Sequence, residues 1–171
     1  ICLVGCKKGS NETTITGEIK GLGTDTLYLY GMDELYDRID TIYVENDKFS
    51  YTTSVDTITS AYLLLKNRIE YPVFLDKGNK IKIKGDTINL NFLTISGNIY
   101  NEEFTDFQKA LEDPADPSEK AGEETVDKRT TVEKANTAEE MAEEFILQHH
   151  SSYVSLYLLD KYFVQKETPD F

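Results

Sequence analysis

The chain has 171 residues and carries 31 acidic against 18 basic side chains, a net charge of −13. This length suffices for one domain of ordinary size plus an appendage, and the core needs no metal or disulfide to support it. The negative charge disfavours binding to nucleic acid and adhesion of side chains to anionic lipid head groups. With 39% hydrophobic and 29% charged residues, the composition is that of a globular chain, neither disordered nor membrane-spanning.

The first residues have the pattern of a bacterial lipoprotein leader. The segment Leu3-Val4-Gly5-Cys6 resembles a lipobox, in which a peptidase cuts before the cysteine and the thiol receives a lipid. We therefore expect residues 1–5 to be the remnant of a signal peptide and residues 6–14 to be the lipidated Cys6 with a flexible tether. Several acyl chains on Cys6 would anchor the protein to a lipid bilayer of the cell envelope, facing the periplasm or the outer surface.

The alternative interpretation of this segment is an ordinary first strand with a buried thiol at Cys6. If the lipobox is correct, Cys2 is discarded with the leader and Cys6 is alkylated, so no free thiol remains. We therefore expect neither a redox site nor a metal site from these two cysteines, and no cofactor.

Residues 15–97 alternate apolar and polar side chains with the period of a β-strand. Eight such segments follow one another, separated by turn signals: 15–19, 25–30, 40–44, 49–53, 61–65, 73–75, 80–84 and 92–96. This pattern predicts a mainly β fold, an antiparallel β-sandwich or open barrel. We expect the first two segments to form a hairpin. The third and fourth should form another, through Asn46 and Asp47, which tolerate the left-handed geometry of tight turns.

Three features of this region are candidates for binding or modification. Lys80, Lys82 and Lys84 share one face of a strand, which is either an anion-binding stripe or a solvated face that discourages edge pairing. Tyr36 lies in a loop, where its ring is either a ligand contact or part of the packing. Four Asp-Thr pairs precede Leu or Ile and resemble the O-glycan acceptor pattern of exported Bacteroidetes-type proteins. The same triplets also arise where a turn ends in Asp and a strand begins with Thr; the threonines are Thr26, Thr41, Thr57 and Thr87.

Residues 98–171 form an acidic helical arm. Within residues 101–150 there are 15 acidic and 5 basic side chains, a net charge of −10, and the hydrophobic period becomes helical. Asn98 or Asn101 is suited to cap a first helix, Thr137 with Glu140 has the spacing of a capping box, and Ser151 or Ser152 can cap a last, largely apolar helix. The domain boundary is therefore expected near Asn98.

The acidic pairs in this arm do not predict a metal or acid-base site. Neighbouring residues of a helix diverge by about 100°, so a pair such as Glu139-Glu140 does not converge on one ion. The same reasoning applies to His149-His150. We therefore expect solvated helix faces, no metal and no catalytic residue in this segment.

Several segments, taken in chain order, resemble a known module. These are the lipobox, the alternating strands, the turn 74–79 that leads into the strand at 80–84, and the helical segment at 145–159, which contains His149-His150-Ser151-Ser152. In that order they resemble the N-terminal domain of unknown function that precedes the thioredoxin-like domain of Bacteroidetes-type lipoprotein thiol-disulfide oxidoreductases. Those proteins are relatives of the TlpA, ResA and AhpC/TSA types. The Cys-x-x-Cys of that redox domain is not present in this sequence.

The resemblance implies a non-catalytic module of a membrane-anchored thiol-disulfide oxidoreductase, with the redox domain downstream. The module would act as a spacer, a docking domain or a dimerisation domain. The alternative is a stand-alone surface lipoprotein that binds a glycan or a peptide through tyrosine-rich loops.

Overall fold

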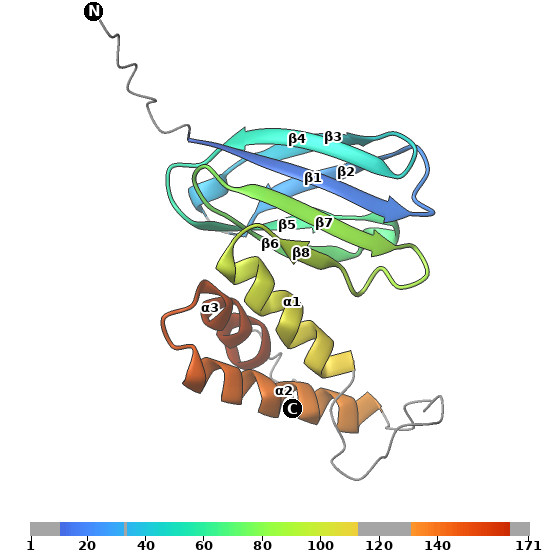
Figure 1. The fold of residues 1–171 in the computed structure, drawn as a ribbon. Coiled ribbons are helices and arrows are strands. Elements are labelled where there is room, and N and C mark those ends of the chain that lie inside the picture. Colours follow the sequence, from blue (N-terminus) through green and yellow to red (C-terminus); the bar gives the residue numbers. More distant parts are fainter. Residues whose placement is uncertain (1–10, 33, 113–130, 165–171) are drawn as a thin grey trace, which may run out of the picture. The chain divides into compact units, whose positions relative to one another are not determined.

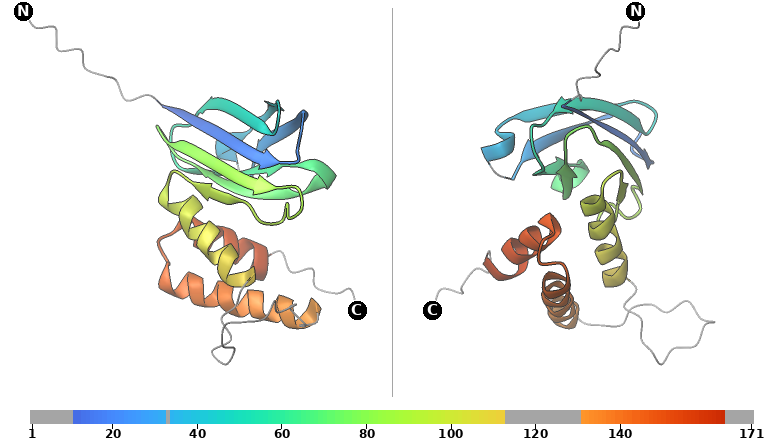
Figure 2. Two further views of the ribbon diagram at one scale, coloured as in Figure 1. Left: turned by 45° about the vertical axis from the view of Figure 1, so that its right-hand side comes forward. Right: turned by 60° about the vertical axis from the view of Figure 1, so that its left-hand side comes forward.

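The computed structural model describes residues 11–32, 34–112 and 131–164, and their side chains except those of residues 67 and 131–136. Eight strands form two four-stranded sheets that lie face to face as a β-sandwich not closed into a barrel (Figures 1 and 2). The sheet that we call sheet A has the order β4-β1-β7-β8, and sheet B has the order β3-β2-β5-β6. The mainly β class and the sandwich predicted from the alternation are confirmed.

All eight predicted strands are present, with bounds that differ by a few residues. They are β1 (Glu12–Lys20), β2 (Asp25–Gly31), β3 (Ile39–Val44), β4 (Lys48–Ser54), β5 (Thr59–Leu64), β6 (Glu70–Leu75), β7 (Lys80–Asp86) and β8 (Thr94–Ser96). All pairs of neighbouring strands are antiparallel except β1 and β7, which run parallel. Pro72 lies in β6, an edge strand that, among the described strands, pairs only with β5. No described strand on its other side needs the N–H that proline lacks.

The core lies between the sheets and follows from the alternation. Ile15 and Ile19 of β1, Leu27 and Leu29 of β2, and Ile81 of β7 are each fully buried. Burial of aliphatic side chains on the inner faces supplies the main driving force for such a fold. Gly17 leaves room on the same inner face for the ring of Phe49, its partner in β4, since a Cβ there would lie 2.1 Å from the ring.

The two expected hairpins do not form as predicted. Both edges of β1 are occupied, by β4 and by β7, so none is left for β2. The Gly21-Leu22-Gly23 link instead crosses from one sheet to the other and buries Leu22, while both glycines adopt positive φ. Between β3 and β4 the tight turn is present, with Asn46 and Asp47 at positive φ, but the two strands then separate into different sheets.

Helix α1 (Ile99–Glu112) begins at the residue expected to cap it, because the Asn98 side chain accepts a hydrogen bond from the backbone N–H of Asn101 at 2.9 Å. Its first turns belong to the sandwich. The chain divides into two compact units, residues 1–105 and 106–171, so the division falls inside this helix.

The second unit contains α2 (Thr131–Gln148), α3 (Tyr153–Leu159) and a turn of π-helix (Asp160–Val164). Thr137 lies inside α2, so the capping box predicted at Thr137 is not a helix start. Ser152 caps α3 as expected, since its side chain accepts from the N–H of Val154 at 3.1 Å. In the part of the chain that the structure describes, no helix is both long and apolar enough to cross a membrane.

Candidate functional site

One turn, residues 76–79 between β6 and β7, contacts both the start of β1, where the chain enters the sandwich, and the start of α1, where it leaves. On the entering side, the N–H of Thr14 donates to the carbonyl of Asn79 at 3.0 Å, and the Thr13 hydroxyl donates to the carbonyl of Asp76. On the leaving side, the Asn98 side chain donates to the Asn79 side chain and to the carbonyl of Phe74, both at 2.9 Å. The turn singled out by its sequence therefore holds both β1 and the start of α1.

An open depression of about 700 Å³ lies over this turn. Its lining brings two lysines and two carboxylates together, from residues Glu12, Thr14, Asp76, Lys77, Gly78, Asn79 and Lys80. These charges are mixed in sign, so the depression has no clear preference for an anion or a cation.

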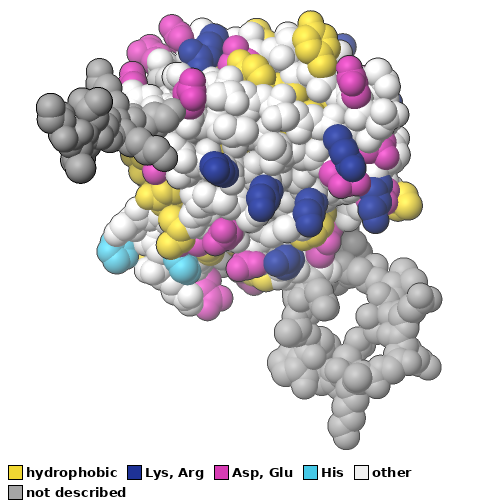
Figure 3. Space-filling view, turned by 45° about the horizontal axis from the view of Figure 1, so that its top comes forward, with side chains coloured by type: hydrophobic (Ala, Val, Ile, Leu, Met, Phe, Trp, Pro, Cys, Tyr) yellow, Lys and Arg dark blue, Asp and Glu magenta, His cyan; other side chains and the backbone are white. Residues whose placement is uncertain are grey.

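The outer face of sheet A, which we call the lysine face, carries Lys80, Lys82 and Lys84 in one row along β7. The register places Thr14, Thr16 and Glu18 of β1 beside them. Among the described residues, no carboxylate forms an ion pair with any of these three lysines. A row of basic side chains is visible on this side of the molecule in Figure 3. The three lysines thus share one solvated face, as their spacing predicts.

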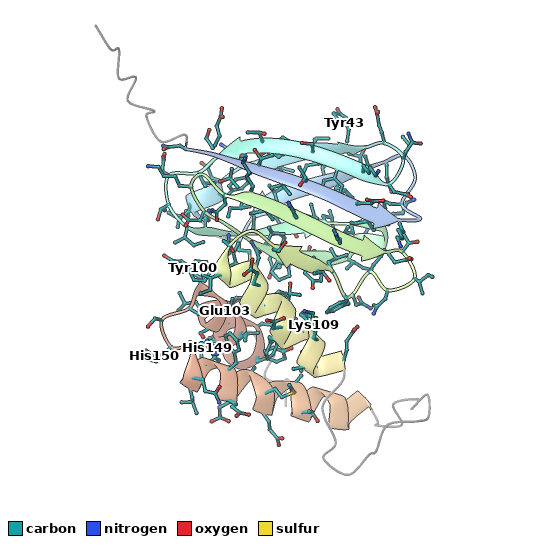
Figure 4. The ribbon with its side chains drawn as sticks, viewed as in Figure 1. Tyr43, Tyr100, Glu103, Lys109, His149 and His150 are labelled. Atoms are coloured by element: carbon teal, nitrogen blue, oxygen red, sulfur yellow. The ribbon has the colours of Figure 1, made fainter. Side chains whose placement is uncertain are left out.

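The outer face of sheet B differs in character. We call it the tyrosine face, and its outward positions on three strands are Thr26, Tyr28, Tyr30, Ile39, Thr41, Tyr43, Ser60, Tyr62 and Leu64. None of these nine residues is charged. Tyr43 is 73% exposed and projects away from the sandwich (Figure 4), and Tyr28 is 41% exposed. The sequence did not single out these tyrosines as candidates, because alternation alone does not show which face of a sheet is covered.

Tyr36 lies elsewhere, in a short 3-10 helix (Glu34–Tyr36), and it is 4% exposed. Its hydroxyl donates to the carboxylate of Asp40 in β3 and lies 3.2 Å from the hydroxyl of Thr53 in β4. The Arg38 guanidinium pairs with Asp40 at 3.1 Å and lies 4.6 Å from the centre of the Tyr36 ring. These groups connect β3 to β4, the corner where no ladder joins the two sheets.

The electrostatics of this corner cluster follow from burial and mutual hydrogen bonding. Burial and the hydrogen bond to Asp40 raise the pKa of Tyr36 to about 12. Burial alone would raise the pKa of Asp40, but hydrogen bonds from Tyr36, Tyr51 and Arg38 outweigh it and lower that pKa. The Tyr36 hydroxyl is thus favoured in its protonated form and the Asp40 carboxyl in its ionised form, which are the two forms that the hydrogen bond between them requires.

The four candidate O-glycan acceptors differ in exposure. Thr41, on the tyrosine face, and Thr57, in a bend between β4 and β5, are exposed, whereas Thr26 and Thr87 are half-buried. Cys6, the predicted lipidation site, lies outside the described residues. Modification of these residues stays a prediction.

The histidines and acidic pairs of the arm lie on helices or at their ends. His149 stacks on Phe145 at 4.3 Å, and its carbonyl accepts a hydrogen bond from the Ser155 hydroxyl at 2.7 Å, so this passage forms the link between α2 and α3. Within the described ranges, no three metal-ligating side chains gather in one place.

The fold and these surfaces define a two-sheet β-sandwich module with one lysine-rich and one tyrosine-rich outer face. A protein-family model described as a domain of unknown function, DUF4369, matches residues 13–104, more than half of the chain. The chain belongs to the DUF4369 family. The match covers all eight strands, apart from the first residue of β1, and the first six residues of α1. The search of curated proteins found no match to the chain.

Proposed function

We propose that this chain is the non-catalytic N-terminal module of a lipid-anchored, cell-envelope thiol-disulfide oxidoreductase, and that it acts there as a docking domain. Cys6 carries the acyl anchor, and a thioredoxin-like domain downstream supplies the redox chemistry. Membership in a family of domains of unknown function supports a modular role. The lipobox at residues 3–6 and the order of the segments support the envelope context.

One observation favours docking over spacing: β1 begins and α1 begins at the same turn. Thr14 and Asn98 both bond to Asn79, so the first strand of the sandwich and the helix that follows its last strand begin at one end of the two sheets. An in-line spacer would enter and leave at opposite ends. A sandwich whose two connections lie at one end is suited to present its outer faces to partners instead.

Lipidation of Cys6 is tested by expressing the full gene in cells that grow in the presence of radiolabelled palmitate. We expect label on the wild-type protein and on Cys2→Ser, because Cys2 leaves with the signal peptide, and none on Cys6→Ser. Label retained by Cys6→Ser would contradict lipidation at this residue.

The redox context is tested by reading the gene beyond codon 171 and assaying insulin reduction by its full product. The proposal expects a Cys-x-x-Cys pair and a product whose insulin reduction persists when residues 13–105 are deleted, because insulin needs no docking domain. A stop codon directly after Phe171 would remove the redox role.

The second candidate is a stand-alone surface lipoprotein that binds a glycan or peptide. The exposed tyrosines of sheet B favour it, because exposed aromatic rings gathered on one surface are typical of binding sites. A homodimer is a further candidate partner, distinguished by measuring the mass of the particle in solution.

A further inference from the structure

The tyrosine face has an order that its sequence does not show. Tyr62 of β5 lies opposite Tyr30 of β2, with ring centres 5.7 Å apart. Tyr28 is two residues from Tyr30 on the same strand, a distance of about 7 Å, and on the same face. Tyr43 lies on β3, two residues beyond Thr41, which is the partner of Tyr28. The four rings therefore form a diagonal row across three strands.

The inner end of this row is held in place. The Tyr30 ring lies against Tyr62 at an angle of 41°, and burial together with the neighbouring Glu70 of β6 raises the pKa of Tyr30. Rings that are already fixed lose little conformational entropy when a ligand is placed on them. The other end, Tyr28 and Tyr43, is the more exposed one.

Beyond Tyr43 the row ends in a shallow depression of about 420 Å³. Hydroxyls and carboxylates line it, from residues Thr24, Asp25, Thr26, Tyr43, Val44 and Glu45. Carboxylate oxygens accept hydrogen bonds from ligand hydroxyls, and threonine hydroxyls both donate and accept. Stacking surfaces and hydroxyl partners are thus adjacent on one surface.

We propose that the tyrosine face is a binding site for an uncharged glycan chain. One face of a sugar ring presents C–H groups that stack on the negative face of an aromatic ring, and its edge presents hydroxyls. Successive tyrosines along the row would take successive sugar units, and the depression would take hydroxyls at one end. This inference depends neither on the lipid anchor nor on a redox partner.

Charge excludes acidic glycans as the preferred ligand. No residue of the tyrosine face is basic. Of the two carboxylates at the depression, Asp25 is paired with Lys66 at 3.1 Å, and Glu45 is exposed and forms no ion pair among the described residues. The chain as a whole carries −13, which repels a polyanion.

Size argues against a second copy of the chain as the occupant. Three strands about 4.8 Å apart, each with three outward residues, present roughly 300 Å². Two such faces would bury about 600 Å² together, well under the roughly 1,200 Å² of a stable interface. An extended glycan needs only a narrow track of contacts.

The experiment uses the full chain from a host that adds no O-glycans, because a glycan on Thr41 would lie beside Tyr28. Isothermal titration calorimetry measures binding of cellohexaose, xylohexaose, mannohexaose, laminarihexaose and maltohexaose, with polygalacturonate as the acidic comparison. We expect at least one neutral hexasaccharide to bind and polygalacturonate not to bind.

Variants then locate the site. Tyr28→Ala and Tyr43→Ala should each weaken binding at least tenfold, whereas Tyr43→Phe, which keeps the ring, should stay within about threefold of the wild type. Tyr153→Ala on α3 and Lys82→Ala on the lysine face, both outside the tyrosine face, should leave affinity unchanged. Circular dichroism confirms that each variant folds.

Three results would overturn the proposal. The first is no binding of any neutral hexasaccharide at millimolar concentration. The second is full binding by Tyr28→Ala and Tyr43→Ala. The third is a concentration-dependent dimer that Ile39→Ser dissociates, since that result assigns the face to protein contact.

Discussion

The side chain of Asn101 forms with the backbone of Phe74, on the edge strand β6, the two hydrogen bonds that a neighbouring strand would otherwise form. Its amide oxygen accepts from the Phe74 N–H at 2.9 Å and its amide nitrogen donates to the Phe74 carbonyl at 2.8 Å. One helical turn later, the Thr105 hydroxyl accepts from the N–H of Ile95 and donates to its carbonyl, both at 2.9 Å. Helix α1 thereby satisfies backbone groups on β6 and β8, the edge strands of the two sheets at this corner.

Replacing Asn101 should therefore cost more than a typical helix substitution. Asn101 is 1% exposed, so Asn101→Leu leaves a buried N–H of Phe74 without its partner and weakens the bonding of its carbonyl. We expect a loss of about 2–4 kcal/mol in the free energy of unfolding, measured by urea denaturation. Asp106→Ala, which removes only the exposed pair with Lys109, is the matched control and should change it by less than about 0.5 kcal/mol. Equal effects of the two variants would contradict the conclusion that the hydrogen bonds of Asn101 to Phe74 stabilise the fold.

Tyr36 predicts a loss of stability in alkali. Its pKa is raised by burial and by Asp40 to about 12, so the folded state holds the phenolic proton more tightly than the unfolded state does. This contribution is complete below the unfolded pKa of about 10 and is lost as the pH rises from there to about 12, up to about 2–3 kcal/mol. Urea denaturation between pH 8 and 12 should show a shallower decline for Tyr36→Phe than for wild type. Parallel curves would show that Tyr36 does not titrate in this way.

Asp40 predicts the opposite dependence in acid. Its lowered pKa means that the folded state favours the carboxylate, so its contribution is complete above the unfolded pKa and is lost as the pH falls through the folded pKa. The difference in unfolding free energy between wild type and Asp40→Asn should therefore shrink as the pH is lowered from 6 towards 2. The exposed Asp37→Asn removes a neighbouring carboxylate and is the matched control, which should change the free energy of unfolding at neutral pH by less than about 0.5 kcal/mol. A constant difference for Asp40→Asn would indicate a purely steric effect.

Exposure predicts an order among the candidate glycan acceptors. A transferase reaches Thr57 in its exposed bend most readily, then Thr41, and the half-buried Thr26 and Thr87 least. Mass spectrometry of the protein from its native source should find Thr57 occupied first, and Thr57→Ala should remove that glycan alone. Occupancy confined to Thr26 or Thr87 would contradict this order, and four bare threonines would end the hypothesis.

The sequence by itself determined the class of the fold and much of its local detail. Period-two alternation located all eight strands because a side chain that faces the core must be apolar whatever the strand pairs with. Short-range chemistry likewise sufficed for the turn at Asn46 and Asp47 and for the caps at Asn98 and Ser152, since each involves neighbours in the chain.

Only the tertiary structure decided which strands pair, where the sandwich ends and which residues lie on open surfaces. The pairing of β1 with β7 joins segments far apart in the chain, and it displaces the hairpin with β2 that local sequence favours. Asn101 and Thr105 look like ordinary helix residues until β6 and β8 are placed beside them. Tyr36 and Tyr43 are both tyrosines near β3, yet one is buried at a corner and the other exposed. Burial depends on contacts between distant segments, and a local pattern does not contain them.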